Sequence, residues 1–505
     1  MSAARAQTTA GLIEGVDRDG VTQFLGIPFA APVLGERRFR RPSPGTRWTG
    51  VRRADAASSS PPQLPPPLAV FAAEQAPNNE DCLQLNVYTP GADASRRPVM
   101  VWFYGGGFTI GSASAYDASS LSARGDVVVV TVNYRLGALG FSYLEHVDER
   151  FEGSANVGIL DQVASLKWVR DNIAGFGGDP GCVTIFGESA GGHSVGCLLT
   201  SPEARDLFHR CILQSSAGWG LRTTEWAAEI TAKLMAEVNV TTVEQLQGAD
   251  VDVILAAQAL LPLQLPGADS NRTGPRSLGV GATPFAPTLD GVVLHGAVID
   301  QVAAGSAAKV PVLICHTRDE LQVFAAMGVL PQLGDENELG AMMALSLPDP
   351  KAGVEAYRTA DPQGSLSDWL VSFLTDQNIH MPDFRLAEVR IRHDPRVWMA
   401  RFSWHSPGEN SKFGACHGIE IPFLFGRPGQ TAGLLEGHDP PIELVHTLQD
   451  AWIAFARSGN PNCAGLPEWP RYEEVQRAVM NFDAECEVLH DPDGVVRTIW
   501  DDVVL

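Results

Sequence analysis

The chain has 505 residues, 45% of them hydrophobic and 19% charged, so it is long and apolar enough to bury a large core in water. Its formal net charge of −22 argues against nucleic acid or an anionic membrane as a main partner, because both repel a negative surface. Residues 1–10 lack the apolar centre of a secretory signal, and no later stretch is apolar for as long as a membrane span requires. We therefore expect a cytoplasmic protein with a flexible N-terminus over residues 1–10.

The eight cysteines show no spacing typical of a metal site, either among themselves or with histidine. Several lie in apolar runs, where a thiol serves as a small buried hydrophobic group. We expect a reduced protein that contains no metal and no cofactor.

The first seventy residues predict a hairpin followed by a surface loop. Residues 15–21 alternate about Asp19-Gly20, a dipeptide typical of tight hairpin turns. Residues 57–68 (ASSSPPQLPPPL) are too rich in proline for a core strand, because proline lacks the backbone donor. Two readings stay open for residues 57–71, a movable flap and an inert surface loop.

The rest of the chain alternates between apolar runs and helical patterns. Near-continuous apolar runs at residues 98–104 and 126–132 are typical of parallel strands buried on both faces, and further strands are predicted at 183–186, 212–215, 309–315 and 397–404. Helical spacing or composition appears at residues 156–173, 223–281, 333–395 and 443–457, and two short strands are predicted at 478–482 and 495–499. This order predicts an α/β fold with a large, mostly parallel sheet, helical insertions and one domain over residues 11–505.

One stretch, residues 176–192, carries the strongest chemical signal. An apolar run ends at Gly187-Glu188-Ser189-Ala190-Gly191, and a helix of small residues follows it. Gly-x-Ser-x-Gly between a strand and a helix is the pattern of a nucleophile elbow, in which a strained turn exposes the serine hydroxyl. Ser189 is therefore the candidate nucleophile, with an ordinary turn serine as the alternative.

A serine nucleophile needs a base, and the base needs an acid that orients it. In α/β-hydrolases these follow in the order serine, acid, histidine, on loops after later strands. Glu320 follows one buried run and His417 another, so we predict them as acid and base. Asp319 is the rival acid, and His316 and His193 are the rival bases. A histidine base predicts that activity falls as pH drops through about 6 to 7.

Three consecutive glycines after residues 98–104 predict an oxyanion hole. Backbone amides in a rigid, open loop can stabilise a developing oxyanion. Gly106 and Gly107, with Ala190 next to the nucleophile, are the candidate donors, and a plain tight turn is the alternative. Five aromatic residues are candidates for a substrate pocket, and a place in the hydrophobic core is the equally weighted alternative for each: Phe71, Trp219, Phe285, Phe324 and Phe402.

Taken together, these motifs resemble those of a known family. The matching segments are residues 80–87 (EDCLQLNV), 102–108 (WFYGGGF), 133–137 (NYRLG), 156–162 (NVGILDQ), 176–191, 319–320, 417–423 (HGIEIPF) and 452–462. In this order they resemble the type-B carboxylesterases, in the cholinesterase/carboxylesterase family of the α/β-hydrolase fold. The resemblance extends over nearly the whole chain.

The resemblance implies a serine carboxylesterase that acts through an acyl-serine intermediate. It also implies that Ser215 is a hydroxyl near the triad and that Arg38 and Glu80 form an ion pair. Relatives often bridge the cysteine at position 82 to an earlier cysteine, but no cysteine precedes Cys82 here, so that bridge should be missing. Residues 54–82 also lack the tryptophan of choline-binding relatives, which argues against a cholinesterase proper.

Two alternatives use the same fold. One is a hydrolase of carbamates, amides or lipids with the same machinery, and the other is a non-catalytic binding relative, which typically lacks the nucleophile. We expect a small-molecule ester as the partner, and a monomer or weak homo-oligomer.

Overall fold

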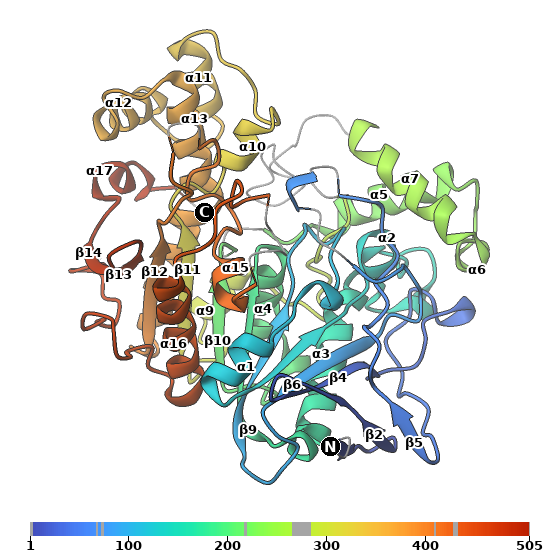
Figure 1. Ribbon diagram of the computed structural model, residues 1–505. Helices are drawn as coiled ribbons and strands as arrows, with labels where there is room; N and C mark the ends of the chain where they lie inside the picture. Colours follow the sequence, from blue (N-terminus) through green and yellow to red (C-terminus); the bar gives the residue numbers. More distant parts are fainter. Residues whose placement is uncertain are drawn as a thin grey trace.

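The structure, a computed structural model, describes residues 4–66, 69–71, 75–216, 220–264, 284–408, 411–427 and 433–503, and it is dominated by one large twisted sheet (Figure 1). Eleven strands of the described residues follow the order β14-β13-β12-β11-β10-β9-β7-β8-β6-β4-β3. The seven strands from β13 to β8 are parallel, and antiparallel strands flank them at both edges. The predicted α/β-hydrolase architecture, a large and mostly parallel sheet, is confirmed.

The central strands are buried on both faces, as their composition predicts. Every residue of β8 and β11 is buried, because helices cover both sides of a parallel sheet. The strands of the large sheet are β3 (Val16–Arg18), β4 (Val21–Pro28), β6 (Gln84–Thr89), β7 (Arg97–Phe103), β8 (Val128–Val132), β9 (Gly178–Glu188), β10 (Arg210–Gln214), β11 (Val312–Thr317), β12 (Val397–Phe402), β13 (Ala478–Phe482) and β14 (Glu487–His490).

The N-terminal segment forms the predicted hairpin and a second, small sheet. Strands β3 and β4 pair antiparallel about Asp19 and Gly20, whose φ angles of 54° and 82° suit a tight hairpin turn. Residues 1–10 are predicted to be flexible, but part of that stretch, β1 (Arg5–Gln7), pairs with β2 (Leu12–Glu14), which in turn pairs with β5 (Val51–Arg53). Ladder hydrogen bonds that the composition does not reveal give this short segment its strand conformation.

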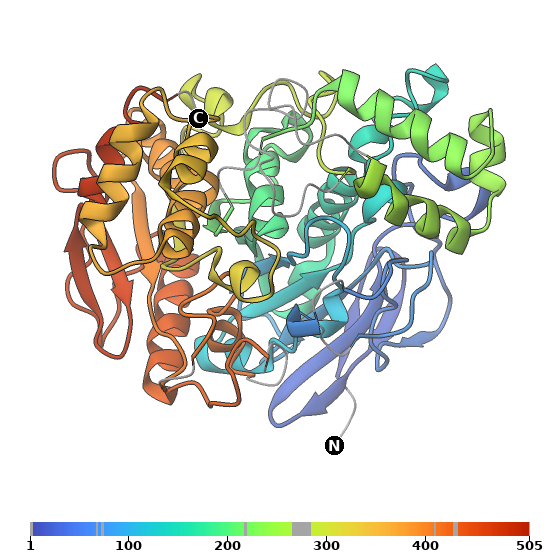
Figure 2. The same cartoon turned by 90° about the horizontal axis from the view of Figure 1, so that it is seen from above.

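Helices cover both faces of the large sheet. Helices α1 and α16 lie on one face, and α3, α4 and α9 lie on the other (Figures 1 and 2). The bounds of the helices are α1 (Ser119–Gly125), α2 (Gly137–Phe141), α3 (Val157–Asn172), α4 (Ala190–Thr200), α5 (Thr224–Glu237), α6 (Val243–Gly248), α7 (Val251–Gln264), α9 (Val298–Ala303), α10 (Gln322–Ala326), α11 (Glu336–Met343), α12 (Pro350–Ala360), α13 (Leu366–Thr375), α14 (Met381–Ile391), α15 (Ile421–Phe425), α16 (Ile442–Ser458) and α17 (Gly494–Arg497). A π-helical turn, Asp376–His380, joins α13 to α14.

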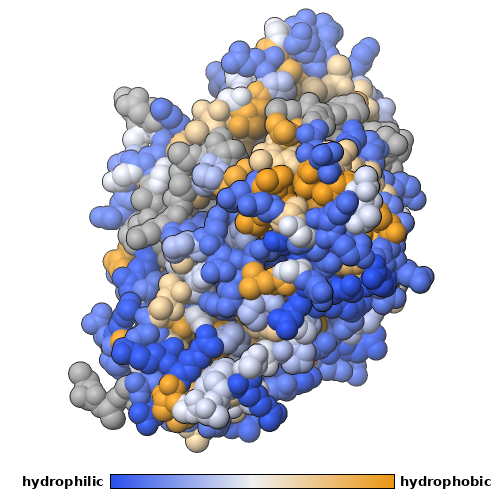
Figure 3. Space-filling view, turned by 90° about the vertical axis from the view of Figure 1, so that its right-hand side faces the viewer, coloured by the Kyte–Doolittle hydropathy of each residue, from blue (hydrophilic) through white to orange (hydrophobic). Residues whose placement is uncertain are grey.

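The predicted helical insertions form two groups above the carboxyl edge of the parallel strands. Helices α5–α7 stand on one side of this edge and α10–α13 on the other (Figure 1). The face that includes α5–α7 is mainly hydrophilic, with hydrophobic side chains gathered in its upper part (Figure 3). Val253 and Leu260 on α7 are among the exposed hydrophobic residues, with 47% and 46% of their surface accessible.

One predicted strand is wrong. Residues 495–499 (VVRTI) are rich in β-branched side chains, yet they form α17 and a following 3₁₀ turn, while the last strand is β14, at Glu487–His490. Val496 and Trp500, four residues apart, are both buried, and the Trp500 ring stacks on Phe373 at 5.5 Å between ring centres. Tertiary packing at helical spacing therefore overrides the local strand preference.

The ion pair implied by the family resemblance is present. Arg38 binds Glu80 with two bonds of 2.7 Å, Nε to Oε1 and Nη2 to Oε2. Its remaining nitrogen, Nη1, donates to the carbonyls of Gln247 and Ala249, so the pair also ties the N-terminal loops to α6. A bidentate, nearly buried arginine of this kind fixes geometry as well as charge.

All eight cysteines are free thiols, and Cys82 is fully buried. Titration with a thiol reagent under denaturing, non-reducing conditions is therefore expected to give eight thiols per chain. A parallel sample that is reduced before titration serves as the control and should give the same number. A lower number in the unreduced sample would contradict the free state of the cysteines.

Candidate active site

The nucleophile elbow has the strained geometry that its sequence predicts. Ser189 lies between β9 and α4 with φ 56° and ψ −124°, a conformation that costs a non-glycine residue about 1–3 kcal/mol. Its N–H donates to the Gln214 carbonyl at 2.9 Å, which fixes the turn against the end of β10. A methyl group on Gly191 would lie 1.9 Å from the Phe103 oxygen, so only glycine lets α4 approach β7 this closely.

The glycine loop after β7 lies directly beside this elbow. A methyl group on Gly105 would come within 3.0 Å of Ser189 Cβ. Gly106 and Gly107 have φ angles of 110° and 61°, and a methyl group on Gly106 would lie 2.3 Å from the Ile110 oxygen. The third predicted donor, Ala190, is the first residue of α4, so its N–H has no partner within the helix. The three predicted oxyanion donors thus belong to two segments that are in contact.

Glu320 and His417 are brought together from two loops that are 97 residues apart. Oε2 of Glu320 lies 2.5 Å from Nδ1 of His417, and Oε1 accepts the Thr317 N–H at 2.7 Å. The His417 N–H also donates to the Glu320 carbonyl at 3.2 Å. Glu320 is fully buried and His417 is 8% exposed, so the pair is almost entirely shielded from water.

The other ring nitrogen of His417 faces the nucleophile elbow. Its Nε2 lies 3.2 Å from Oε1 of Glu188, the residue immediately before Ser189. Among the described residues, the Ser189 hydroxyl makes no hydrogen bond to His417, as is common in enzymes without bound substrate. The imidazole therefore joins the predicted acid to the predicted elbow.

Three buried carboxylates surround this imidazole, and two of them are not predicted from the sequence. Burial lowers the pKa of His417, but Glu188 and Glu320 outweigh it and raise that pKa to about 9. Burial and the neighbouring carboxylates in turn raise the pKa of Glu188 to about 8 and that of Glu420 to about 7. Glu188 lies inside the elbow motif, and Glu420 lies three residues after His417. The motifs therefore contain both residues, but they do not reveal that both carboxylates influence the His417 imidazole.

Glu320 itself stays ionised. Burial raises its pKa, but His417, the Ser215 hydroxyl and the Thr317 N–H together lower it below the ordinary value. Ser215 is therefore close to the acid, at the position that the family resemblance implies. Glu420 is held by Gln214, whose Nε2 donates to Oε1 at 2.9 Å.

The alternative acid, Asp319, and the alternative bases, His316 and His193, make other contacts. Asp319 accepts hydrogen bonds from Arg318 and from the Ala415 N–H, so it joins the two loops without reaching His417. His316 is fully buried, with Nδ1 3.1 Å from Asp383. His193 lies within α4, where the ring packs edge-on against Phe108.

The five aromatic pocket candidates fall into three groups. Phe324 lies 6.1 Å from the His417 ring and 5.9 Å from Phe71, measured between ring centres, so Phe324 stands beside the imidazole and Phe71 stands next to Phe324. Phe402 and Phe285 are buried to 1% exposure or less, and Phe402 packs against Phe423. Trp219 lies outside the described residues.

Comparison with known proteins shows the family to which this chain belongs. Residues 2–494 match the model of the carboxylesterase family. The chain belongs to this family. The carboxylesterase is 36% identical to the para-nitrobenzyl esterase of Bacillus subtilis, with 97% of each chain covered. It is 33% identical to the phenmedipham hydrolase of Pseudarthrobacter oxydans, with 98% of this chain and 99% of the relative covered.

Solved structures of esterases have the same fold as this chain. A para-nitrobenzyl esterase superposes on this carboxylesterase with a TM-score of 0.86 at 34% identity, covering 99% of both chains. A carboxylesterase of Geobacillus stearothermophilus gives a TM-score of 0.85 at 35% identity over 99% and 100% of the two chains. The protein is accordingly a carboxylic ester hydrolase. In the part of the chain that the structure describes, no helix is long and apolar enough to cross a membrane.

The substitution Glu188→Gln is expected to lower the pKa of His417 by roughly one pH unit, because it removes a negative charge next to Nε2. The measurement is an NMR titration of histidine-labelled protein, with the His417 signal assigned by its loss in His417→Gln. The exposed Glu443→Gln on α16 is the control and should leave the titration unchanged. An unchanged His417 pKa in Glu188→Gln would contradict the assigned role of that carboxylate.

Proposed function

We propose that the carboxylesterase hydrolyses small carboxylic esters with Ser189 as nucleophile, His417 as general base and Glu320 as the acid that orients the imidazole. The observation that carries this proposal is the position of the His417 ring, with Nδ1 on Glu320 and Nε2 facing the elbow of Ser189. A histidine oriented by a carboxylate at Nδ1, with Nε2 against the residue that precedes a strained serine, supports the assignment of this pair to nucleophilic catalysis.

In the first half-reaction, Ser189 Oγ bonds to the ester carbonyl carbon while its proton passes to His417 Nε2. The tetrahedral intermediate then expels the alcohol, which takes the proton from the imidazolium and leaves an acyl-serine. In the second half-reaction, water attacks the acyl carbon, gives its proton to His417, and releases the acid as Ser189 regains a proton. Glu320 stays ionised throughout and stabilises the imidazolium.

The raised pKa of His417 sets the pH range of this cycle. Only the neutral imidazole can accept the serine proton, and the flanking carboxylates hold the pKa of the ring at about 9. The activity should therefore rise with pH above the ordinary histidine range, and not only between pH 6 and 7 as an unperturbed histidine predicts.

The oxyanion hole that we propose consists of the N–H groups of Gly106, Gly107 and Ala190. The glycine loop lies against the elbow, where a methyl group on Gly105 would be 3.0 Å from Ser189 Cβ, and this closeness supports the proposal. Such preorganised donors stabilise charge that develops only in the transition state. Phe324, beside the imidazole, and Phe71, next to Phe324, are the pocket residues that we propose to contact the acyl or alcohol group.

Ser189→Ala is expected to lower kcat for a p-nitrophenyl ester about 10⁴-fold or more, because it removes the nucleophile. Ser165→Ala, which changes another buried serine on α3, is the matched control and should retain activity. Circular dichroism checks that both variants are folded. Turnover that persists in folded Ser189→Ala would rule out Ser189 as nucleophile.

Gly106→Ala is expected to lower kcat about 10²–10³-fold with little change in KM, because the added methyl group would meet the Ile110 oxygen at 2.3 Å and displace the donors. Gly340→Ala is the matched control, since nothing lies within 4 Å of the added methyl group on α11. Steady-state kinetics on an ester series provide the measurement. A Gly106→Ala enzyme with undiminished kcat would argue for a plain turn at this position.

A further inference from the structure

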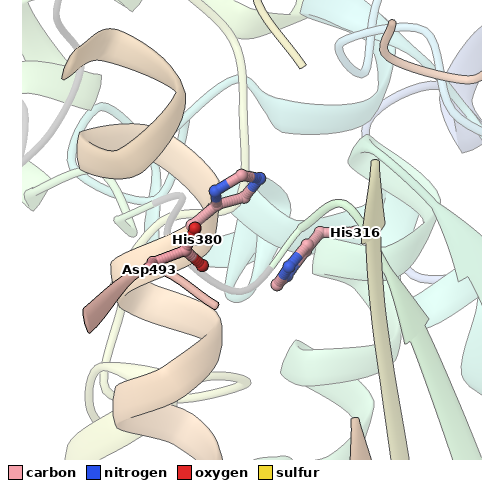
Figure 4. A group of neighbouring side chains, drawn as sticks. All are labelled: His316, His380 and Asp493. Atoms are coloured by element: carbon pink, nitrogen blue, oxygen red, sulfur yellow. The ribbon is translucent and has the colours of Figure 1, made fainter. Parts of the chain in front are cut away.

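A second cluster, in which His316 and His380 are buried and Asp493 is partly exposed, lies next to the acid turn, the turn that carries Glu320. His316 on β11, His380 in the π-helical turn and Asp493 before α17 place one ligand-type atom each within 4.8 Å of one another. Figure 4 shows His380 and Asp493 side by side, with the His316 ring directed toward them. Such a group can hold a metal ion or form a charge network, and the contacts of each atom distinguish the two.

The ring nitrogens of His380 are both engaged by the protein. Nδ1 lies 3.1 Å from Oδ1 of Asp376, and Nε2 lies 2.8 Å from the Thr317 carbonyl oxygen. A carbonyl and a carboxylate both accept hydrogen bonds, so the ring that satisfies both carries a proton on each nitrogen and has no lone pair for a metal. Asp493 is likewise engaged, in an ion pair with Arg401. The contacts therefore favour a charge network.

The charges around His380 hold it as a buried cation. Asp376 faces it from its own turn, Asp493 from the loop before α17, Arg401 from β12 and the neutral His316 ring from β11. Burial and Arg401 lower the pKa of His380, but Asp376 and Asp493 outweigh them and raise it to about 9. Tyr357 donates to the other oxygen of Asp376 at 2.8 Å, so the carboxylate is fixed in turn.

This cation is two hydrogen bonds away from the triad acid. The carbonyl of Thr317 accepts from His380, and the N–H of Thr317 donates to Oε1 of Glu320 at 2.7 Å. The two groups belong to the peptide units on either side of one Cα atom, so fixing one restricts the direction of the other. Oε2 of the same Glu320 carboxylate then binds His417 at 2.5 Å.

The other end of the acid turn is held by the same helical segment. The Leu321 N–H donates to Oγ1 of Thr375 at 3.2 Å. In a regular α-helix, positions five residues apart, such as 375 and 380, point about 140° away from each other. The i→i+5 bonding of a π turn brings such positions closer to the same face, and Thr375 and His380 both contact the turn that carries Glu320.

We propose that the π-helical turn Asp376–His380, together with Thr375, is a positioning element for catalysis, which fixes the backbone of residues 317–321 so that the Glu320 carboxylate holds the His417 imidazole in the reactive orientation. This proposal rests on the proposed function. His380 and Thr375 touch neither substrate nor the reacting atoms, and they act through the acid turn. Loss of either contact lets the Glu320 carboxylate rotate, which loosens the His417 ring and weakens its support as a base.

The test compares His380→Leu and His380→Gln with the unchanged enzyme on p-nitrophenyl butyrate, with active sites counted by a serine-reactive organophosphate. In His380→Leu, kcat per titrated site should fall about 10- to 100-fold with KM within about twofold, because the acid is misplaced while the pocket is intact. The acid limb of the kcat/KM profile should move about 0.5 pH units lower, since His417 loses part of the support of Glu320. His380→Gln, whose amide can still donate to the Thr317 carbonyl, should recover most of kcat.

His393→Leu is the matched control, because His393 also contacts a backbone carbonyl, that of Ala303 at 2.8 Å, which belongs to α9 and not to the acid turn. It should leave kcat and the pH profile unchanged. Wild-type kcat per titrated site and an unmoved acid limb in His380→Leu would overturn the proposal, as would a loss explained wholly by fewer titrated sites.

Thr375→Val keeps the test decisive if His380→Leu does not fold. This near-isosteric change removes only the acceptor for the Leu321 N–H, so kcat per titrated site should fall about 3- to 10-fold with the same downward movement of the acid limb. Unchanged kinetics in Thr375→Val would overturn the proposal. If the organophosphate does not modify Ser189 in the unchanged enzyme, the proposed function fails, and that outcome is separate from a failure of the positioning element.

Discussion

The carboxylate–imidazole contact between Glu320 and His417 is the interaction on which the rest of the site depends. Both groups are nearly inaccessible to water, so each is stable only while its partner and its hydrogen-bond donors are in place. Around them lie Glu188 and Glu420, whose negative charge raises the pKa of the imidazole that we propose as the base. An imidazolium is therefore stabilised by the fold before any substrate arrives, and the pKa of the base is raised as a consequence.

Close packing also constrains the backbone at the nucleophile elbow. Strand β7, strand β9 and helix α4 converge so closely that a single methyl group on Gly191 or Gly187 would collide with the Phe103 oxygen. This packing brings the amides of the glycine loop next to Ser189 and holds the serine in a conformation that few residues adopt. The strain is sustained by the sheet, where the ends of β7, β9 and β10 are locked by parallel pairing.

Buried hydrogen bonds connect the site to the surrounding strands and helices. Gln214 accepts the Ser189 N–H with its carbonyl, donates to Glu420 with its amide, and accepts from Trp452 on α16. On the opposite side, His380 and Thr375 hold the acid turn from the helical group above the sheet. Ser189 and the turn that carries Glu320 are thus supported by separate elements, β10 and the π-helical segment, through hydrogen bonds in a dry interior.

Much of this arrangement can be predicted from the amino-acid sequence, because the motifs that indicate it are short and local. A strained turn needs flanking glycines, a glycine loop follows a buried strand, and parallel strands bury both faces, so the elbow, the loop and the sheet can be recognised within short windows. The contacts that tune the site are of another kind. The contacts of Glu188 with His417 and of His380 with Thr317 join segments far apart in the chain, and the helix at 495–499 is followed by Trp500, which packs on the distant Phe373. These contacts depend on strand register and helix packing across the whole core, so they cannot be predicted from any short stretch of sequence.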